Sequence, residues 1–192
     1  MAIEIKNISK TFDGKAVLCD FSLTVEDGNN LVIMGESGSG KTTLLNILAG
    51  LIKADSGEIS GLEGKKIGFV FQEDRLVETF SVYRNIKLAC GRGIGRKQIE
   101  NALIQTGLDK TVSSAKISTL SGGMKRRVAI IRALLCECDI LLLDEPTKGL
   151  DEQNKRLVID FILDKAKDKT VIWVTHDEDE AALVSDVKVV IE

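Results

Sequence analysis

Apolar residues follow two different patterns in the first third of the chain, and each predicts a different kind of strand. Apolar and polar positions alternate over residues 3–8 and 21–25, which is typical of strands with one buried face. Residues 31–34 are continuously apolar, as expected of a strand that is buried on both faces. Further strands in the sheet are predicted at residues 66–71, 140–143, 170–175 and 187–191.

Helical spacing of apolar residues separates these strands. Helices are predicted at residues 41–49, 81–90, 96–106, 122–135 and 151–165. A last helix begins at residues 177–180, whose acidic side chains suit the positive end of a helix. The alternation of strands and helices predicts an α/β fold with a mostly parallel sheet, to which the N-terminal strands add an antiparallel β subdomain.

Residues 73–117 break the alternation of strands and helices. They contain two predicted helices joined by a flexible connector at residues 91–95. We therefore expect a single domain with a core of about residues 1–72 and 118–192 and a helical insert of about residues 73–117. Ser121 and Asp151 are the expected N-caps of the two helices that follow. The inward residues of the helix that follows Asp151 are expected to be Leu157, Val158, Phe161 and Ile162.

The bulk composition restricts the possible partners and locations. The 192 residues carry a formal charge of −3, which provides no general attraction to nucleic acid. The sequence predicts no signal peptide, and no apolar run reaches the roughly 18 residues of a membrane helix. A role in transport would therefore require docking onto a separate membrane protein.

Two small clusters have simple interpretations in the sequence. The four cysteines, at positions 19, 90, 136 and 138, lack the spacing of a zinc site, and we expect free thiols in a reducing compartment, the cytosol. The basic cluster at residues 125–127 predicts a solvated helix face.

The segment from Gly35 to Thr42 has the sequence GESGSGKT, which is typical of a phosphate-binding loop. It lies between a buried strand and a helix, where backbone N–H groups can surround phosphates. Lys41 would reach the outer phosphates of a nucleoside triphosphate, and the Thr42 hydroxyl would bind Mg²⁺. The residues expected to bind ATP here are Gly35, Glu36, Ser37, Gly38, Ser39, Gly40, Lys41, Thr42 and Thr43. A P-loop NTPase core is the fold that this context predicts.

Polar residues also follow the other buried strands. Gln72, the pair Asp144-Glu145 and His176 each come directly after one. Because ligands gather at the carboxyl edge of a parallel sheet, we expect these residues near the phosphate loop. Asp144 is assigned to the metal, Glu145 to general-base catalysis on water, and His176, the one histidine in the chain, to the γ-phosphate.

The segment Leu120-Ser-Gly-Gly123, about twenty positions ahead of the segment ending in Asp144-Glu145, completes a set of motifs. In this order and spacing, the set resembles the nucleotide-binding subunit of ATP-binding cassette (ABC) transporters. The resemblance implies that Phe12 stacks on adenine and that Gln72 touches Mg²⁺ or the attacking water. It also implies that Ser121, Gly122 and Gly123 cover the ATP of the opposite subunit in a head-to-tail dimer, with Asp151 at the interface.

Small departures and local similarities refine this resemblance. Met124 replaces the more usual glutamine, Ile131 stands where a small residue is common, and Lys148 adds a charge before the loop that ends at Asp151. Residues 71–76 and Met124 are similar to importer subunits of the nitrate, sulfonate and taurine group, although exporter families of similar sequence stay open.

The expected partners follow from the same resemblance. They are a second ATPase subunit, identical or a close paralogue, integral membrane permease subunits, and in importers an extracytoplasmic substrate-binding protein. The chain would then lie on the inner face of the cell membrane, with residues 73–117 docked on the permease. The alternatives are an ABC-type ATPase switch with no membrane partner and a P-loop kinase, which leaves Ser121–Gly123 and Asp151 unexplained.

Overall fold

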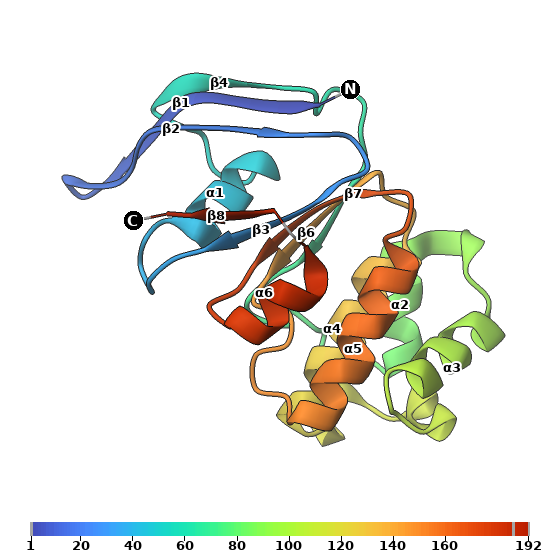
Figure 1. Cartoon of the computed structure of the whole chain (residues 1–192). Helices are drawn as coiled ribbons and strands as arrows, with labels where there is room; N and C mark the ends of the chain where they lie inside the picture. The colour runs from blue at the N-terminus through green and yellow to red at the C-terminus, as the bar shows by residue number, and fades with distance from the viewer. Residues whose placement is uncertain (1, 186, 192) are drawn as a thin grey trace. The chain divides into compact units, whose positions relative to one another are not determined.

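The computed structural model describes residues 2–185 and 187–191, and of residue 92 only the backbone. By its internal contacts the chain forms two compact units, both built from discontinuous segments. The first unit contains residues 1–69, 139–145 and 168–192, and the second contains residues 70–138 and 146–167. Figure 1 shows the helices and strands of both units.

The first unit holds two sheets that share one hydrophobic core. The antiparallel sheet has the order β2-β1-β4, formed by β1 (Ile3–Phe12), β2 (Lys15–Val25) and β4 (Ser56–Ser60). The second sheet has the order β5-β6-β7-β3-β8, and β3 pairs in parallel with both β7 and β8. Its strands are β3 (Asn30–Met34), β5 (Ile67–Val70), β6 (Ile140–Asp144), β7 (Thr170–Val174) and β8 (Lys188–Val190). These pairings confirm the predicted parallel sheet and antiparallel subdomain.

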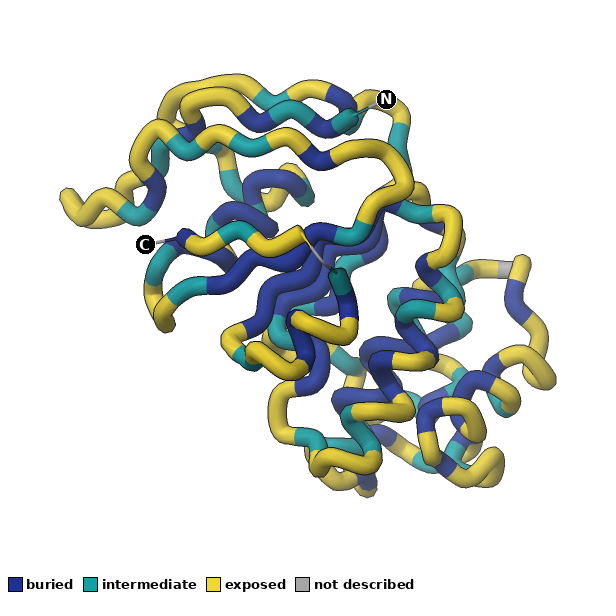
Figure 2. The backbone as a smooth tube through the Cα atoms, in the orientation of Figure 1, coloured by how far each residue is buried: buried dark blue, intermediate teal, exposed yellow. Residues whose placement is uncertain are grey.

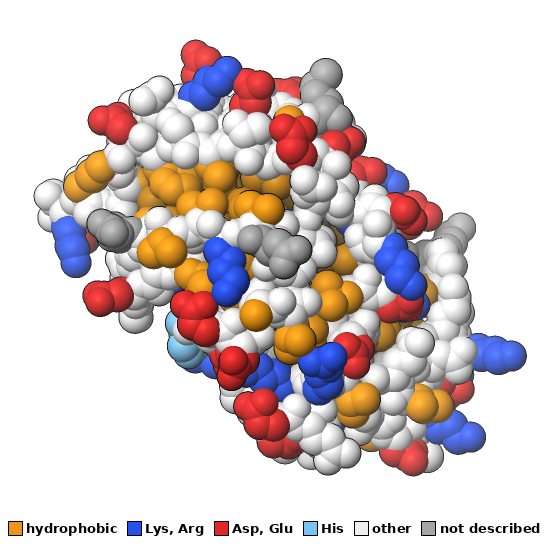
Figure 3. All heavy atoms as spheres, viewed as in Figure 1, with side chains coloured by type: hydrophobic (Ala, Val, Ile, Leu, Met, Phe, Trp, Pro, Cys, Tyr) orange, Lys and Arg blue, Asp and Glu red, His pale blue; other side chains and the backbone are white. Residues whose placement is uncertain are grey.

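Helix α1 (Lys41–Leu48) packs between the two sheets. Its buried Leu44, Leu45 and Leu48 join one core with Ile3 and Ile5 of β1 and with residues of β3, β6 and β7. The backbone tube in Figure 2 is buried along the central strands, as the continuous apolar runs predict. Hydrophobic side chains of this unit also gather in a surface band between the antiparallel sheet and β8 (Figure 3).

The second unit is helical. It consists of α2 (Val82–Cys90), α3 (Arg96–Gln105), α4 (Gly122–Leu135) and α5 (Glu152–Lys165), with short 3₁₀ turns before α3 and before α4. Ser121 and Asp151 cap α4 and α5 by accepting backbone N–H groups, as predicted. The remaining helix, α6 (Glu178–Val184), belongs to the first unit and follows β7.

Two local features were not predicted, and one local expectation is wrong. The connector predicted at residues 91–95 includes the 3₁₀ turn Gly91–Gly93. No apolar run in the sequence indicates strand β4, because four of its five residues are exposed. Leu157, predicted to face inward, is 36% exposed, whereas Val158, Phe161 and Ile162 are buried.

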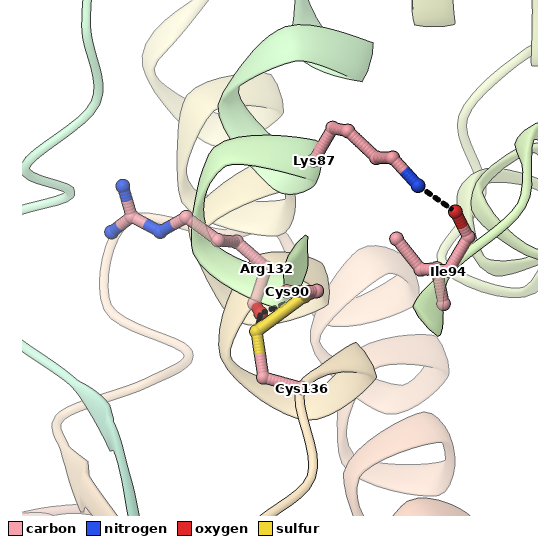
Figure 4. Close-up of a disulfide and its surroundings, with 5 residues drawn as sticks. All are labelled: Lys87, Cys90, Ile94, Arg132 and Cys136. Atoms are coloured by element: carbon pink, nitrogen blue, oxygen red, sulfur yellow. Dashed lines mark hydrogen bonds between the residues drawn. A yellow bond between two sulfur atoms is a disulfide. The ribbon is translucent and has the colours of Figure 1, made fainter. Parts of the chain in front are cut away.

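Two of the four cysteines form a disulfide, so the expectation of free thiols is wrong for Cys90 and Cys136. The pair joins the last residue of α2 to the C-cap of α4 across a sequence separation of 46 residues (Figure 4). Their Cα atoms lie 4.7 Å apart because α2 packs directly on α4. Cys19 and Cys138 have free thiols. Pairing of this kind depends on tertiary packing, and cysteine spacing alone does not predict it.

Candidate active site

The glycine-rich segment joins β3 to α1 and forms one wall of a cavity in the first unit. Gly40 precedes the helix with φ 96°, and a Cβ atom there would lie 2.7 Å from the carbonyl oxygen of Val17. Only glycine fits both this backbone conformation and this close approach. The cavity has a volume of about 830 Å³ and is lined by residues 35–39 together with Val17, His176 and Ile191. This volume lies within the usual range of sites for small molecules and cofactors.

Lys41, the first residue of α1, is 6% exposed and directs its ammonium into the glycine-rich segment. Its Nζ donates hydrogen bonds to the carbonyl oxygens of Gly35 and Glu36, at 2.8 and 2.5 Å. Burial lowers the pKa of Lys41, whereas the nearby carboxylates of Glu145 and Asp144 act to raise it. The cation therefore lies close to both carboxylates, at the place where phosphate groups would enter.

Asp144 and Glu145 lie where β6 ends. Asp144 is 1% exposed, and the backbone N–H of Glu145 donates to the carbonyl oxygen of Val174 on the neighbouring strand β7. Glu145 has φ 46°, an uncommon conformation for a residue other than glycine. Its Oε1 lies 3.3 Å from Nδ1 of His176, which follows β7. The parallel pairing of β6 and β7 thus brings the carboxylate and the imidazole together, as the sequence predicted.

The oxygen ligands near Lys41 suit magnesium. Asp144 offers a buried carboxylate, and Thr42 offers a hydroxyl in the first turn of α1. Hard oxygen donors of this kind are the ligands that Mg²⁺ prefers. Among the described residues no group of three or more His, Cys, Asp or Glu side chains is placed to hold a metal. A magnesium ion here would therefore need phosphate and water oxygens to complete its coordination, which is common in sites that bind nucleoside triphosphates.

Phe12, the residue predicted to stack on adenine, lies near β2 residues that line the cavity. Phe12, at the end of β1, is 41% exposed, has the ammonium of Lys10 5.2 Å from its ring centroid, and does not line the cavity. Ala16 and Val17 of β2 line it instead. These two residues could not be predicted, because small apolar side chains on an edge strand have no distinctive pattern.

The other predicted site residues lie in the second unit, and each has a defined place there. Gln72 follows β5 and is exposed. Ser121 is the N-cap of α4, and its hydroxyl accepts the N–H of Met124 at 3.4 Å. Gly123 lies beside the loop before α5, because a Cβ atom added to it would be 3.4 Å from a methyl carbon of Leu150. The predicted interface residue Asp151 caps α5 at the end of that loop.

Arg126 is a residue of this unit whose role the sequence analysis missed. The predicted solvated face is wrong, because Arg126 and Arg127 are only 4% and 8% exposed. Arg126 Nε donates to the carbonyl oxygen of Pro146 at 2.8 Å, and Nη1 donates to that of Phe71 at 2.6 Å and to that of Gln72 at 3.3 Å. One guanidinium thus joins α4 to the segments that follow β5 and β6. A fork of several donors is a property of arginine that lysine lacks.

We expect Arg126→Ala to lower the free energy of unfolding by roughly 3 kcal/mol, since the carbonyl groups of three residues lose a charged donor in a buried place. Urea denaturation followed by circular dichroism measures the effect. Arg126→Lys keeps the charge but cannot reach both segments, so it should recover less than half of the loss. Full recovery by lysine would show that charge, rather than the fork, is what matters.

Comparisons with known proteins identify the family of the chain. The family model for ABC transporters matches residues 18–148. An aliphatic sulfonates import ATP-binding protein, SsuB 2 from Pseudomonas syringae, is 38% identical over 186 residues, covering 96% of this chain and 79% of its own. The sulfate/thiosulfate import ATP-binding protein CysA from Escherichia coli is also 38% identical, and this chain spans 56% of its length.

Solved structures show the same fold. The structure of the ATP-binding cassette MJ0796 in a dimeric post-hydrolysis state with ADP and Pi superposes with a TM-score of 0.87 at 32% identity. The two chains match over 99% of this one and 94% of the other. The chain therefore belongs to the ABC transporter family and is an ATP-hydrolysing cassette of that family.

Proposed function

We propose that this chain is the ATPase subunit of an ABC importer, and that it drives transport through separate membrane subunits. The observation that carries the proposal is the convergence of Lys41, Asp144, Glu145 and His176 around the glycine-rich segment. The whole of residues 1–192 would form one ABC ATPase domain, with residues 73–117 as its helical insert. The names of the SsuB and CysA relatives support import over export.

In the proposed mechanism Lys41 exchanges its backbone carbonyl partners for the outer phosphates of ATP. Glu145 accepts a proton from the attacking water, and His176, held 3.3 Å from it, contacts the γ-phosphate. Thr42 and Asp144 would hold Mg²⁺, which neutralises charge that develops on the phosphates. Gln72 would contact the metal or the water, and it would thereby link the occupied ATP site to the helical insert.

The second half of the site would come from another copy of the chain. Ser121, Gly122 and Gly123 begin the 14-residue helix α4, and the exposed N–H groups there can bind the γ-phosphate of a facing subunit. Asp151 would lie in the interface and Phe12 would stack on adenine. The solved MJ0796 cassettes are dimeric, and one of them is bound to ADP and Pi, which supports a dimer as the working form.

Membrane partners complete the proposal. No helix in the described part of the chain has the length and hydrophobicity to cross a bilayer. The names of the import relatives favour a place on the inner face of the cell membrane, where the chain would bind permease subunits through residues 73–117. An extracytoplasmic binding protein would deliver the substrate, for which small oxyanions such as sulfonates are the class that the relatives' names favour.

Purification from native membranes in ATP tests this proposal. The Glu145→Gln variant should hold ATP and co-purify with a multi-span membrane protein identified by mass spectrometry. A matched variant that adds Arg75→Glu, in the segment after Gln72, should bind ATP equally and lose the membrane protein. Recovery of no membrane-embedded protein with the first variant would contradict the transport role and leave an ATP-dependent switch.

A further inference from the structure

Glu180 is a buried carboxylate that the mechanism above does not use. It lies in the first turn of α6, whose N-cap Asp177 directly follows His176, and is 2% exposed. Its Oε1 accepts the indole N–H of Trp173 at 3.0 Å, and its Oε2 accepts the hydroxyl of Thr175 at 2.6 Å. Burying a carboxylate costs free energy unless hydrogen bonds compensate it, so these two bonds account for its place in the core.

The two donors lie on one face of the extended segment formed by β7 and the residue that follows it. Side chains two residues apart along a strand point to the same side of a sheet. Trp173 and Thr175 are such a pair, both 2% exposed or less, and Glu180 reaches both. Glu180 therefore joins α6 to the end of β7 and to Thr175, the residue before His176.

Further hydrogen bonds join the residues on both sides of His176 to each other and to Glu180. The hydroxyl of Thr175 accepts the N–H of Asp177 at 3.1 Å, and Asp177 Oδ1 accepts the N–H of Glu180 at 2.9 Å. The imidazole itself has a side-chain exposure of 67% and meets Glu145 at 3.3 Å. The backbone that carries this ring is held on one side by the bond from the Thr175 N–H to the carbonyl oxygen of Ile33. On the other side it is held by the bonds that link Asp177, the Thr175 hydroxyl and the buried carboxylate of Glu180.

We propose that Glu180 is a positioning residue for His176, holding its ring against Glu145 through Thr175 and Asp177. This inference rests on the proposed role of His176 in hydrolysis. Removal of the carboxylate leaves the indole N–H and the Thr175 hydroxyl without this acceptor, and the turn that carries His176 loses its anchor. ATP binding depends on the glycine-rich segment and Lys41, so it should be nearly unaffected.

A double-mutant cycle between Glu180 and His176 tests the proposal. We expect His176→Ala and Glu180→Ala each to lower kcat by about tenfold or more, with KM for ATP changed less than about threefold. The double variant should be no slower than His176→Ala alone, because Glu180 acts through that ring. Glu180→Gln should keep most of the activity, since its amide can accept from Trp173 and donate to Thr175.

Thr175→Val provides a second variant that keeps the shape of the strand while it removes the hydroxyl. It should lower kcat in the parent and have no effect in the His176→Ala background, and thermal melting verifies that each variant is folded. Effects that multiply in the double variants would overturn the inference, because Glu180 would then support the fold at large. Parental turnover in His176→Ala would overturn the role of His176 itself, and the inference with it.

Discussion

Glu145→Gln should lower ATP turnover by about 10²–10⁴-fold while ATP still binds, since a positioned general base contributes about that much to the rate. The amide keeps the size of the side chain and its place beside His176, but it cannot accept a proton from water. Phosphate release measured at saturating ATP gives the rate. Fluorescence titration with a labelled ATP analogue gives the affinity, which should stay within a few-fold of that of the parent.

Glu26→Gln is the matched control for this variant, because Glu26 is an exposed carboxylate just before the turn at Asp27-Gly28. Its turnover should equal that of the parent. If Glu145→Gln hydrolysed ATP within a few-fold of the parent rate, the general base would have to be another group and the assignment of Glu145 would be wrong.

Lys41→Ala should weaken ATP binding by roughly 100-fold, or about 2.7 kcal/mol, because it removes charge-assisted hydrogen bonds to phosphate in a partly enclosed site. It also removes the cation whose charge Glu145 and Asp144 influence, so the site becomes more negative where the phosphates bind. Isothermal titration calorimetry with ATP measures the affinity of the folded variant.

Lys53→Ala removes an exposed lysine of the same unit and should bind ATP as the parent does. A Lys41→Ala protein with parental affinity would show that the nucleotide does not use the glycine-rich segment. Loss of affinity in both variants would indicate a general effect of charge.

The parts of the site that sequence reasoning predicted are those that short stretches of chain determine. The glycine-rich segment, the N-cap Ser121 and the position of Glu145 after a strand depend on local backbone preferences, which residue types reveal. The proximity of Glu145 and His176 followed from one further rule, that parallel strands place their carboxyl ends at one edge.

The features that the sequence left unpredicted depend on distant partners. Arg126 looks like a surface cation until α4 brings it to the carbonyl groups of residues 71, 72 and 146. Glu180 was expected only as an acidic residue in the first turn of a helix, yet it is buried against Trp173. The Cys90–Cys136 pair likewise depends on the packing of α2 on α4. The burial of a charged or reactive side chain depends on its tertiary contacts. Residue spacing along the chain does not reveal those contacts.

Mixing two inactive variants tests most directly the central claim that each ATP site is shared between two chains. Lys41→Ala disables the site at the glycine-rich segment, and Ser121→Arg places a bulky cation at the start of α4. A mixed head-to-tail dimer contains one Lys41→Ala chain and one Ser121→Arg chain. Both substitutions then lie in the same ATP site, and the other ATP site has an intact Lys41 and an intact Ser121.

Each variant alone should therefore be nearly inactive, and an equimolar mixture should recover roughly a quarter of parental ATPase activity if half of the dimers are mixed. Co-expression with two different affinity tags, followed by tandem purification, would isolate the mixed dimers and raise that to about half. No recovery in purified mixed dimers would contradict the account, because it would mean that Lys41 and Ser121 serve the same nucleotide within one chain.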